Sequence, residues 1–295
     1  MKLDEILQRV PWLTKSVFRD LVRKGVLTTS SKGSGKGRGL GSETGTYAEN
    51  SIEILHSVAQ LRDQVRKADL VYAILWEGHE VNYEKLRDRL FDDFHDLNKY
   101  LNQMSSLPDD SEAIERAAEY RLPKMKPGKP TQNEVDRREQ LMEKEIENLH
   151  REFEFVKRIA QRLPIGQYIQ MVTNGIEMDG EVTGFFDEWF SKDRWHSVIK
   201  ATTSDDLRQV HRSILLLKEY MSILMQTNPE LYEQFYVVLR LLKKPVFLKI
   251  GTFLLLVPAF RGFILGLDDP AKKELWVKTS MEMKDSENLR GGDTL

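Results

Sequence analysis

The sequence predicts a mainly all-α protein, with a helix-turn-helix near its N-terminus and a large helical domain after it. Three observations support this fold class. Apolar residues recur every three or four positions along most of the chain, one segment keeps a heptad pattern over three repeats, and only short runs look like strands. With 295 residues, 40% of them hydrophobic and 31% charged, the chain is long and apolar enough to form a sizeable core.

Two short helices are expected within the first 25 residues. The first contains Ile6, Leu7 and Val10 and ends before the proline at position 11. The second begins after Thr14 and ends at Gly25, because glycine commonly terminates helices. Its apolar residues recur at helical spacing and are Val17, Phe18, Leu21 and Val22. The pair is therefore a helix-turn-helix.

A glycine-rich basic loop, TTSSKGSGKGRGLGSETGTY, occupies residues 28–47. Residues 1–68 contain twelve Lys or Arg and seven Asp or Glu, whereas the whole chain has a net charge of −2. We expect Lys32, Lys36 and Arg38 to contact a nucleic-acid backbone or minor groove from a wing. A solubilising surface loop is the alternative. A phosphate-binding P-loop is not expected, because Gly37 stands where that motif needs Ser or Thr after the lysine.

The remaining chain divides by composition. Helical spacing continues to residue 75, a Gly-centred break follows, and the next helix has an apolar face of Leu86, Leu90, Phe94, Leu97, Leu101 and Met104. The sequence YRLPKMKPGKP, with three prolines, is typical of a linker. We expect a helix-turn-helix with its wing at 1–75, a helical extension at 76–119, a linker at 120–133, a helical dimerisation or effector domain at 134–283 and a flexible tail at 284–295.

The heptad pattern lies in the expected dimerisation or effector domain. Spacings of four and three alternate along its apolar residues, which are Met142, Ile146, Leu149, Phe153, Val156, Ala160 and Leu163. Charged residues occupy the other faces, as in a helix with one buried stripe. Such a seam requires a partner helix, either in a second subunit or elsewhere in the same chain. Three heptads do not decide between the two.

A mostly apolar segment at residues 246–267 approaches the length that spans a bilayer. Lys249 and Arg261 interrupt it, so the longest uncharged stretch is 250–260, and Pro258 lies inside that stretch. Eleven residues are too few to cross the hydrocarbon. We expect a kinked, buried helix or two short helices, and no membrane partner.

The first ten residues and the cysteine count bear on the compartment. Asp4 and Glu5 lie where an export signal needs an apolar run, so no such signal is expected. The absence of cysteine excludes disulfides, thiolate metal sites and cysteine nucleophiles, and it fits a reducing cytoplasm. The sequence thus predicts a cytoplasmic protein.

No pattern indicates catalysis. The six histidines are scattered without the i, i+4 spacing of a helical zinc site, and no acid-base pair or nucleophile stands out. We expect no enzyme activity, no metal and no cofactor. Aromatic residues at 185–190, with Trp195 and His196, are expected to pack in the core, and a pocket for a small-molecule effector is the alternative.

The start of the second helix is the part expected to meet DNA, because a recognition helix presents its N-terminal residues to base edges. Arg19 is suited to bidentate binding of guanine, and Lys15 to a phosphate. The expected contacts from this helix are Thr14, Lys15, Ser16 and Arg19.

Residues 3–75 resemble the winged helix-turn-helix of MerR-type transcriptional regulators. In that family the second helix ends in Arg, two aromatic residues, Glu, two variable residues and Gly-Leu; Arg19 and Gly25 match, and the aromatic and glutamate positions hold other residues. Tyr47 matches the tyrosine that ends the family's wing, which adds it to the expected DNA-binding residues. Leu75–Val81 is similar to an LW-x-G-x-x-V sequence found after this domain in a looser subgroup. The resemblance implies a dimer that reads a near-palindromic site.

These observations predict a sequence-specific transcriptional regulator that binds double-stranded DNA as a homodimer. Two alternatives remain from the sequence. One is an architectural, phage or plasmid accessory DNA-binding protein that uses the same wing. The other is a helical protein-protein interaction module whose basic loop contacts acidic partners or a membrane surface.

Overall fold

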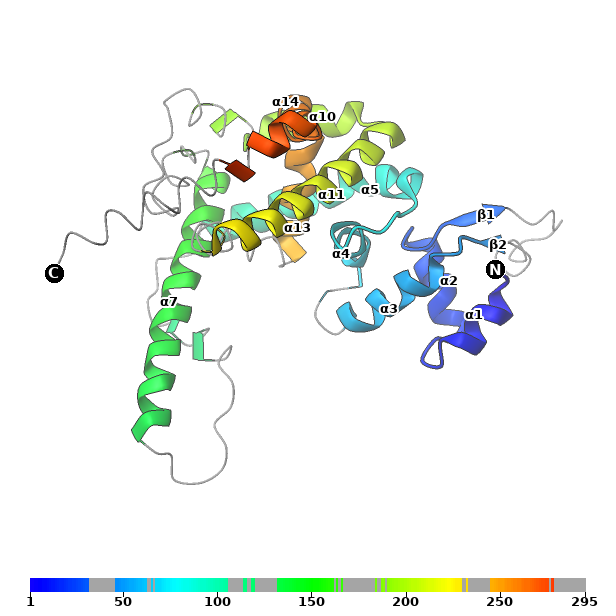
Figure 1. Ribbon diagram of the computed structural model, residues 1–295, viewed down its shortest axis with the longest axis horizontal. Helices are drawn as coiled ribbons and strands as arrows, with labels where there is room; N and C mark the ends of the chain where they lie inside the picture. The colour runs from blue at the N-terminus through cyan, green and yellow to red at the C-terminus, as the bar shows by residue number, and fades with distance from the viewer. Residues whose placement is uncertain are drawn as a thin grey trace. The chain divides into compact units, whose positions relative to one another are not determined.

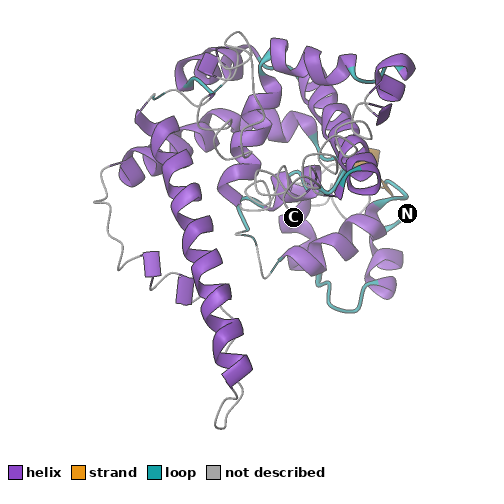
Figure 2. Cartoon of the chain, turned by 60° about the vertical axis from the view of Figure 1, so that its left-hand side comes forward, coloured by secondary structure: helices purple, strands orange, loops and turns teal. Residues whose placement is uncertain are grey.

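A computed structural model describes residues 1–31, 46–62, 65, 67–105, 114–115, 118–119, 132–161, 163, 166, 184, 187–188, 190–229, 232, 245–275 and 277–278. Helices account for most of these residues, and two short strands are the only extended elements among them (Figure 2). The prediction of a mainly all-α fold is confirmed.

The elements follow one another in an order that Figure 1 traces by colour. The N-terminal helices and strands are α1 (Leu3–Arg9), α2 (Lys15–Arg23), β1 (Thr29–Ser31), β2 (Thr46–Tyr47), α3 (Ser51–Leu61) and α4 (Leu70–Trp76). The later helices are α5 (Tyr83–Ser105), α7 (Gln132–Gln161), α10 (Lys192–Ala201), α11 (Ser204–Thr227), α13 (Pro245–Leu256) and α14 (Pro258–Gly266).

The chain forms two compact units. Unit 1 combines Met1–Phe94 with Trp195–Leu295, and unit 2 contains His95–Arg194. This division differs from the expected segments, because the C-terminal helices group with the N-terminal ones instead of with the heptad helix. Composition carries no information about which distant segments pack together.

The first two helices end and begin where the sequence indicates. The Thr14 hydroxyl accepts a hydrogen bond from the Val17 N–H at 3.2 Å and so caps the start of α2. Gly25, with φ +79°, follows its end, where the Val26 N–H donates to the Leu21 carbonyl in a Schellman arrangement. The predicted stop at Gly25 is confirmed.

Replacing Gly25 with alanine is expected to lower the free energy of unfolding by about 1–2 kcal/mol, the cost of a left-handed backbone for a residue with a Cβ. The new Cβ would also lie 3.0 Å from that of Lys85. Urea denaturation measures the change. Gly262→Ala is the matched control: it lies in α14 with open space around it, so alanine there should stabilise by about 0.5–1 kcal/mol. Equal effects at both sites would contradict the assigned backbone geometry.

The strands β1 and β2 pair antiparallel, with Thr29 opposite Tyr47 and Ser31 opposite Thr46. Met1 extends this pairing, because the Tyr47 N–H donates to the Met1 carbonyl at 2.9 Å and the Met1 nitrogen donates to the Tyr47 carbonyl at 3.0 Å. The two strands bring both ends of the glycine-rich loop together beside α2. The loop itself, residues 32–45, lies outside the described residues.

The helix α4 is the centre of unit 1. Six consecutive residues, Leu70 to Leu75, are buried, and α4 packs against α3, α11 and α13. Its next residue, Trp76, donates from its indole nitrogen to the Leu248 carbonyl and to the Thr252 hydroxyl, both at 3.1 Å. Helices from the two ends of the chain therefore share one core.

Gly78 ends α4 in the left-handed conformation, with φ +90°. Its carbonyl lies 3.0 Å from His211 Nε2 on α11, and the other ring nitrogen of His211 lies 3.0 Å from the Tyr83 hydroxyl. Next to it, His79 Nε2 lies 2.8 Å from the Ser57 hydroxyl of α3, and burial lowers the pKa of His79. These polar contacts hold the break between α4 and α5 against two other helices.

The helix α5 has the predicted apolar face. Its buried residues are Leu86, Leu90, Phe94, Leu97 and Leu101. Asn82 precedes the helix and caps it through an acceptor oxygen, 3.0 Å from the Lys85 N–H. The predicted contribution of Met104 lies outside the described side chains.

The apolar segment near the C-terminus forms two helices, α13 and α14, that meet at an angle of 86° at Pro258. The prediction of two short helices is confirmed; Ile250 and Phe253 are buried in the core. In the described part of the chain, no single helix is both long enough and apolar enough to cross a membrane. The bent pair of α13 and α14 reaches the required length and apolar composition only when the two helices are counted together.

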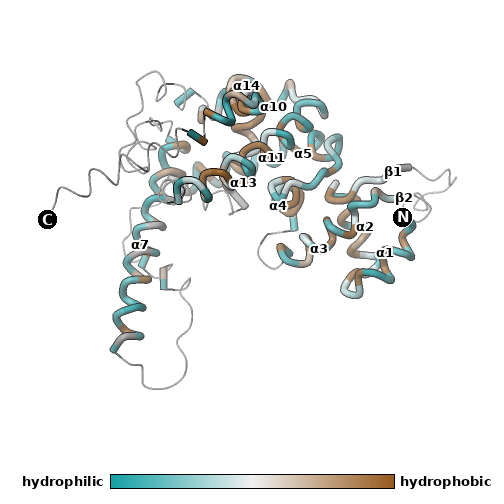
Figure 3. Tube along the Cα trace, viewed as in Figure 1, coloured by the Kyte–Doolittle hydropathy of each residue, from teal (hydrophilic) through white to brown (hydrophobic). Residues whose placement is uncertain are grey.

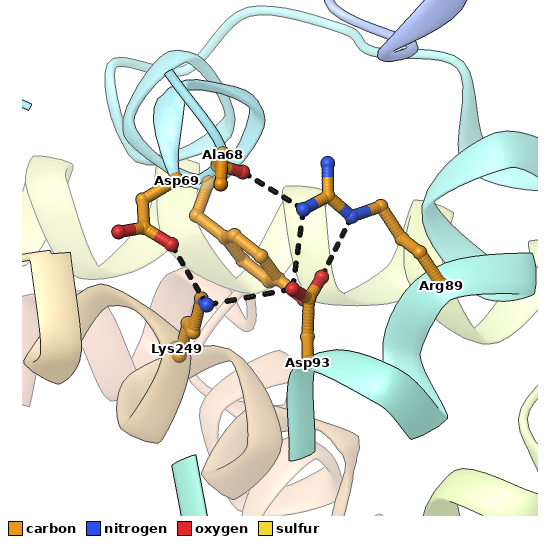
Figure 4. Close-up of polar contacts among 6 residues, drawn as sticks. Ala68, Asp69, Arg89, Asp93 and Lys249 are labelled. Atoms are coloured by element: carbon orange, nitrogen blue, oxygen red, sulfur yellow. Dashed lines mark hydrogen bonds and ion pairs between the residues drawn. The ribbon is translucent and has the colours of Figure 1, made fainter. Parts of the chain in front are cut away.

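Two carboxylates and two cations from α4, α5 and α13 and the residue before α4 form a cluster, in which Asp69, Asp93 and Lys249 are buried and Arg89 is half-buried (Figure 4). Lys249 Nζ lies 2.7 Å from Asp69 Oδ1 and 3.4 Å from Asp93 Oδ1, and Arg89 Nε lies 2.7 Å from Asp93 Oδ2. Tyr72 donates its hydroxyl to Asp93 at 2.9 Å. Two cations thus balance two carboxylates, as burial of charge requires.

The heptad helix is present as α7, along which polar and apolar residues alternate (Figure 3). Among its described side chains, Phe155, Val156 and Ile159 are buried, and of these three Val156 belongs to the predicted seam. Phe155 meets the ring of Phe190 edge to face, with centroids 5.5 Å apart. The seam residues Met142, Ile146, Leu149 and Phe153 are half-buried, and Leu163 is 42% exposed. Among the described side chains of α7, the most buried positions therefore lie beside the seam and include one of its residues, Val156.

Several predictions fall on residues that are not described. They are most of the linker at 120–133, the greater part of the aromatic run at 185–190 and the tail at 284–295. Trp195, beside that run, is fully buried and lies against Phe253. For this residue the core-packing interpretation is confirmed.

Candidate nucleic-acid interface

The exposed face of α2 is the centre of the candidate interface. Ser16, Arg19 and Arg23 recur at spacings of three and four and are all exposed, so they share one side of the helix. Val17 lies beside them and is 40% exposed. The opposite side of α2 packs inward through Phe18 and Leu21.

A groove of about 890 Å³ runs along this face of α2. One wall is α2 itself, and the other side consists of the turn before α2, the end of α3 and the residues leading into α4. The lining residues are Trp12, Ser16, Val17, Arg19, Asp20, Leu21, Arg23, Lys24, Val58, Arg62, Val65, Lys67 and Leu70. Among the described residues of this lining, five are cations and one is a carboxylate, so positive charge is in excess there.

The single carboxylate lies between two of the cations. Arg23 Nη2 is 2.5 Å from Asp20 Oδ1, and Lys24 Nζ is 2.6 Å from Asp20 Oδ2. The hydrogen bond from Lys24 lowers the pKa of Asp20, with a further contribution from Arg23, although partial burial acts in the opposite direction. Asp20 is therefore ionised at neutral pH and neutralises part of the positive charge on α2.

The far wall has a different character. The Arg62 guanidinium lies over the ring of Trp12, 5.1 Å from its centroid, which is within the range of a cation-π contact. Below them the floor is apolar and consists of Leu21, Val58, Val65 and Leu70. The groove thus combines a cationic rim with an aromatic wall and an apolar base.

The end of α2 is fixed by its neighbours. Lys85 donates from Nζ to the Val22 carbonyl at 2.5 Å, and the Asn82 N–H donates to the Gly25 carbonyl at 2.8 Å. A cation at a helix C-terminus also interacts favourably with the helix dipole. These contacts from the start of α5 set the direction in which Arg19 and Arg23 project.

The structure places the sequence-predicted residues in different surroundings. Ser16 and Arg19 line the groove together. Thr14 is exposed and caps α2, and Lys15 lies outside the groove with its ammonium 3.8 Å from Asp4 Oδ1. That pair is highly exposed and therefore weak. Lys32, Lys36 and Arg38 lie outside the described residues.

Tyr47 requires a correction. Its side chain is 1% exposed, and its ring packs edge to face on Phe18 with centroids 4.7 Å apart. Burial also raises the pKa of its hydroxyl. A ring enclosed in the core has no surface to offer DNA, so Tyr47 supports α2 from behind instead of contacting a ligand.

The cationic and aromatic groove residues that were not predicted as site residues are Trp12, Arg23, Lys24, Arg62 and Lys67. Arg23 had a signal in the sequence, because it lies one helical turn after Arg19 on the same face. Trp12 and Arg62 had none, since fifty residues separate them and only the packing of α3 against the helix-turn-helix brings them together.

No metal centre accompanies the groove. Across the described ranges, no three His, Asp or Glu side chains come together as metal ligands would. Comparison with protein-family models, with curated proteins and with solved structures finds no match for the chain.

Proposed function

We propose that the protein is a sequence-specific DNA-binding transcriptional regulator that inserts α2 into the major groove. The observation that carries this proposal is the exposed row of Ser16, Arg19 and Arg23 on a helix that follows a tight turn, beside a groove with five cations. A helix of this kind fits the major groove, and its arginines suit both guanine edges and phosphates.

The roles follow from position along α2. Arg19 lies in the middle of the exposed row and takes the base-edge contact, whereas Arg23, Arg62 and Lys67 lie further along the groove and take phosphates. The strands β1 and β2 form the base of a wing, and Lys32, Lys36 and Arg38 in its loop add backbone or minor-groove contacts. The wing contributes affinity and salt dependence more than sequence choice.

A second copy of the chain completes the proposed regulator. The half-buried seam of α7, Met142 to Phe153, retains apolar surface on a helix with charged flanks. Pairing of this seam between two subunits would present two α2 helices to a near-palindromic site. Sedimentation of the protein and of Leu149→Lys tests the pairing: a dimer that becomes a monomer supports it, and an unchanged dimer assigns the contact elsewhere.

Binding to a pool of random duplexes at two salt concentrations, followed by sequencing of the retained DNA, tests the proposed function. Enrichment of one sequence, with a second half-site related by symmetry, is the expected result. Retention that depends on salt but enriches nothing would favour an architectural DNA-binding protein. No retention at the lower salt concentration would overturn the proposal.

Asp20→Asn is expected to strengthen binding to every duplex and to steepen its salt dependence, because the substitution releases Arg23 and Lys24 from their shared carboxylate. Each additional phosphate contact steepens the slope of log K against log salt by about 0.9, so we expect a change of about one to two units. Fluorescence anisotropy with a labelled duplex measures both quantities. Asp88→Asn, which removes an exposed partner of Arg87 on α5, should change neither. A weaker or unchanged affinity of Asp20→Asn would show that this part of α2 faces away from DNA.

A further inference from the structure

The groove beside α2 has features that a phosphate backbone does not use. Cations on the rim are sufficient for DNA, yet this groove also has an apolar floor and an aromatic wall in Trp12. Val17, 40% exposed, adds apolar surface on the opposite wall. An extended polyanion gains little from these groups, whereas a compact ligand with an apolar body would be in contact with all of them.

We propose that this groove binds an amphipathic organic anion, a molecule with an aromatic or other flat apolar body and one carboxylate, sulfonate or phosphate group. Its volume of about 890 Å³ lies within the range of small-molecule sites, about 300–1,000 Å³. The excess of cations selects the charge of the ligand, because an anionic group forms charge-assisted hydrogen bonds with arginine. A cationic or neutral molecule of the same shape lacks this interaction.

Each part of the ligand has a place. The apolar body lies against Trp12 and Val17 above the floor of Leu21 and Leu70. The anionic group meets the guanidinium of Arg62, which already lies over the Trp12 ring and so stands at the edge of the apolar surface. Lys67 lines the same groove and adds a second positive charge beyond α2.

Occupation of the groove has a consequence for DNA. Arg19 and Arg23 line the groove and also form the exposed row on α2, so an anion bound there would screen the side chains that DNA requires. Ligand and DNA then compete, and each weakens the binding of the other by the same factor. The competition rests on the proposed function, whereas the ligand site itself does not.

The test uses the full chain with two fluorescent probes of nearly the same shape. One is 8-anilinonaphthalene-1-sulfonate, and the other is N-phenyl-1-naphthylamine, which lacks the sulfonate. We expect the anionic probe to bind and the neutral probe to bind at least about tenfold more weakly, the scale of one charge-assisted contact. Equal binding of the two probes would overturn the proposal.

Two double variants locate the site. Arg62→Gln with Lys67→Gln removes two charges from the groove without altering α2. This variant should bind the anionic probe about tenfold or more weakly than the unmodified protein does. Arg87→Gln with Arg212→Gln removes two exposed charges on α5 and α11, outside the groove. The affinity of this variant for the anionic probe should stay within about twofold of that of the unmodified protein. Equal effects of the two pairs would place the probe elsewhere.

A third variant and a DNA-displacement measurement distinguish failure of the proposed ligand site from failure of the proposed DNA-binding function. Val17→Asp adds a carboxylate at an exposed position of the wall and should abolish probe binding, with circular dichroism confirming the helical content. Addition of the anionic probe should release a labelled duplex from the unmodified protein. If the probe binds in a charge-dependent manner but the protein retains no duplex, the ligand site stands and the DNA-binding function fails. If duplex binds and the probe does not displace it, the shared site is wrong.

Discussion

Replacement of Lys249 with methionine is expected to lower the free energy of unfolding by about 3–5 kcal/mol, the usual cost of removing one partner from a buried ion pair. Lys249 Nζ lies 2.7 Å from Asp69 Oδ1, and the Asp69 side chain is 0% exposed. Without the ammonium, a carboxylate remains in the core near a second one, Asp93. Methionine preserves most of the volume, so loss of charge dominates the effect.

Urea denaturation followed by circular dichroism measures this change. Lys218→Met is the matched control, because Lys218 pairs with Glu77 at 3.8 Å with both side chains about half exposed, and it should cost less than about 1 kcal/mol. Combining Lys249→Met with Asp69→Asn should recover part of the loss, since the uncompensated charge is then gone. Similar effects for Lys249→Met and Lys218→Met would mean that the cluster is open to water.

Replacement of Arg19 with alanine is expected to cost about 1–3 kcal/mol in binding to the selected duplex and to relax the preference at one base pair, which is the signature of a bidentate contact with guanine. Arg23→Ala should instead weaken binding to all duplexes similarly, because a phosphate contact carries no sequence information. The two residues lie one turn apart on α2, so the pair compares two contact types at nearly the same place.

Anisotropy titrations of each variant with the selected duplex and with single-base variants of it give both effects. Arg87→Ala, an exposed arginine on α5 paired with Asp88, controls for the loss of one positive charge and should leave affinity and preference unchanged. A uniform loss for Arg19→Ala across all base pairs would reassign this residue to the backbone. No loss for either arginine would remove α2 from the DNA interface.

Features encoded locally in the sequence were predicted well. The stop at Gly25, the apolar face of α5 and the division at Pro258 each depend on residues within a few positions of one another. Helical spacing and glycine or proline chemistry are sufficient for these, because they act within one or two turns. The buried positions Phe18 and Leu21 of α2 followed for the same reason.

Features assembled from distant segments were not predicted. In the sequence, Lys249 interrupts an apolar run and so indicates only that the run does not span a membrane. The ion-pair partners of Lys249 are Asp93 and Asp69, which lie 156 and 180 positions earlier in the chain. The groove requires Trp12 and Arg62 to meet, and the ring contact of Phe155 on α7 requires Phe190. Tyr47 was misassigned because a family resemblance marks its position in the sequence but not its burial.

The partition of the core between two distant segments of the chain also sets an order of events during synthesis. The helix α4 leaves the ribosome with its row of buried residues complete, but α13, which covers it, follows about 170 residues later. At the usual elongation rates of about 5–20 residues per second, that interval lasts roughly 10 to 30 seconds. During this interval the nascent chain exposes apolar surface of α4 in the same unit as the basic groove. Until α13 arrives, α4 has α3 and α11 as its packing partners, and the surface that α13 covers stays open.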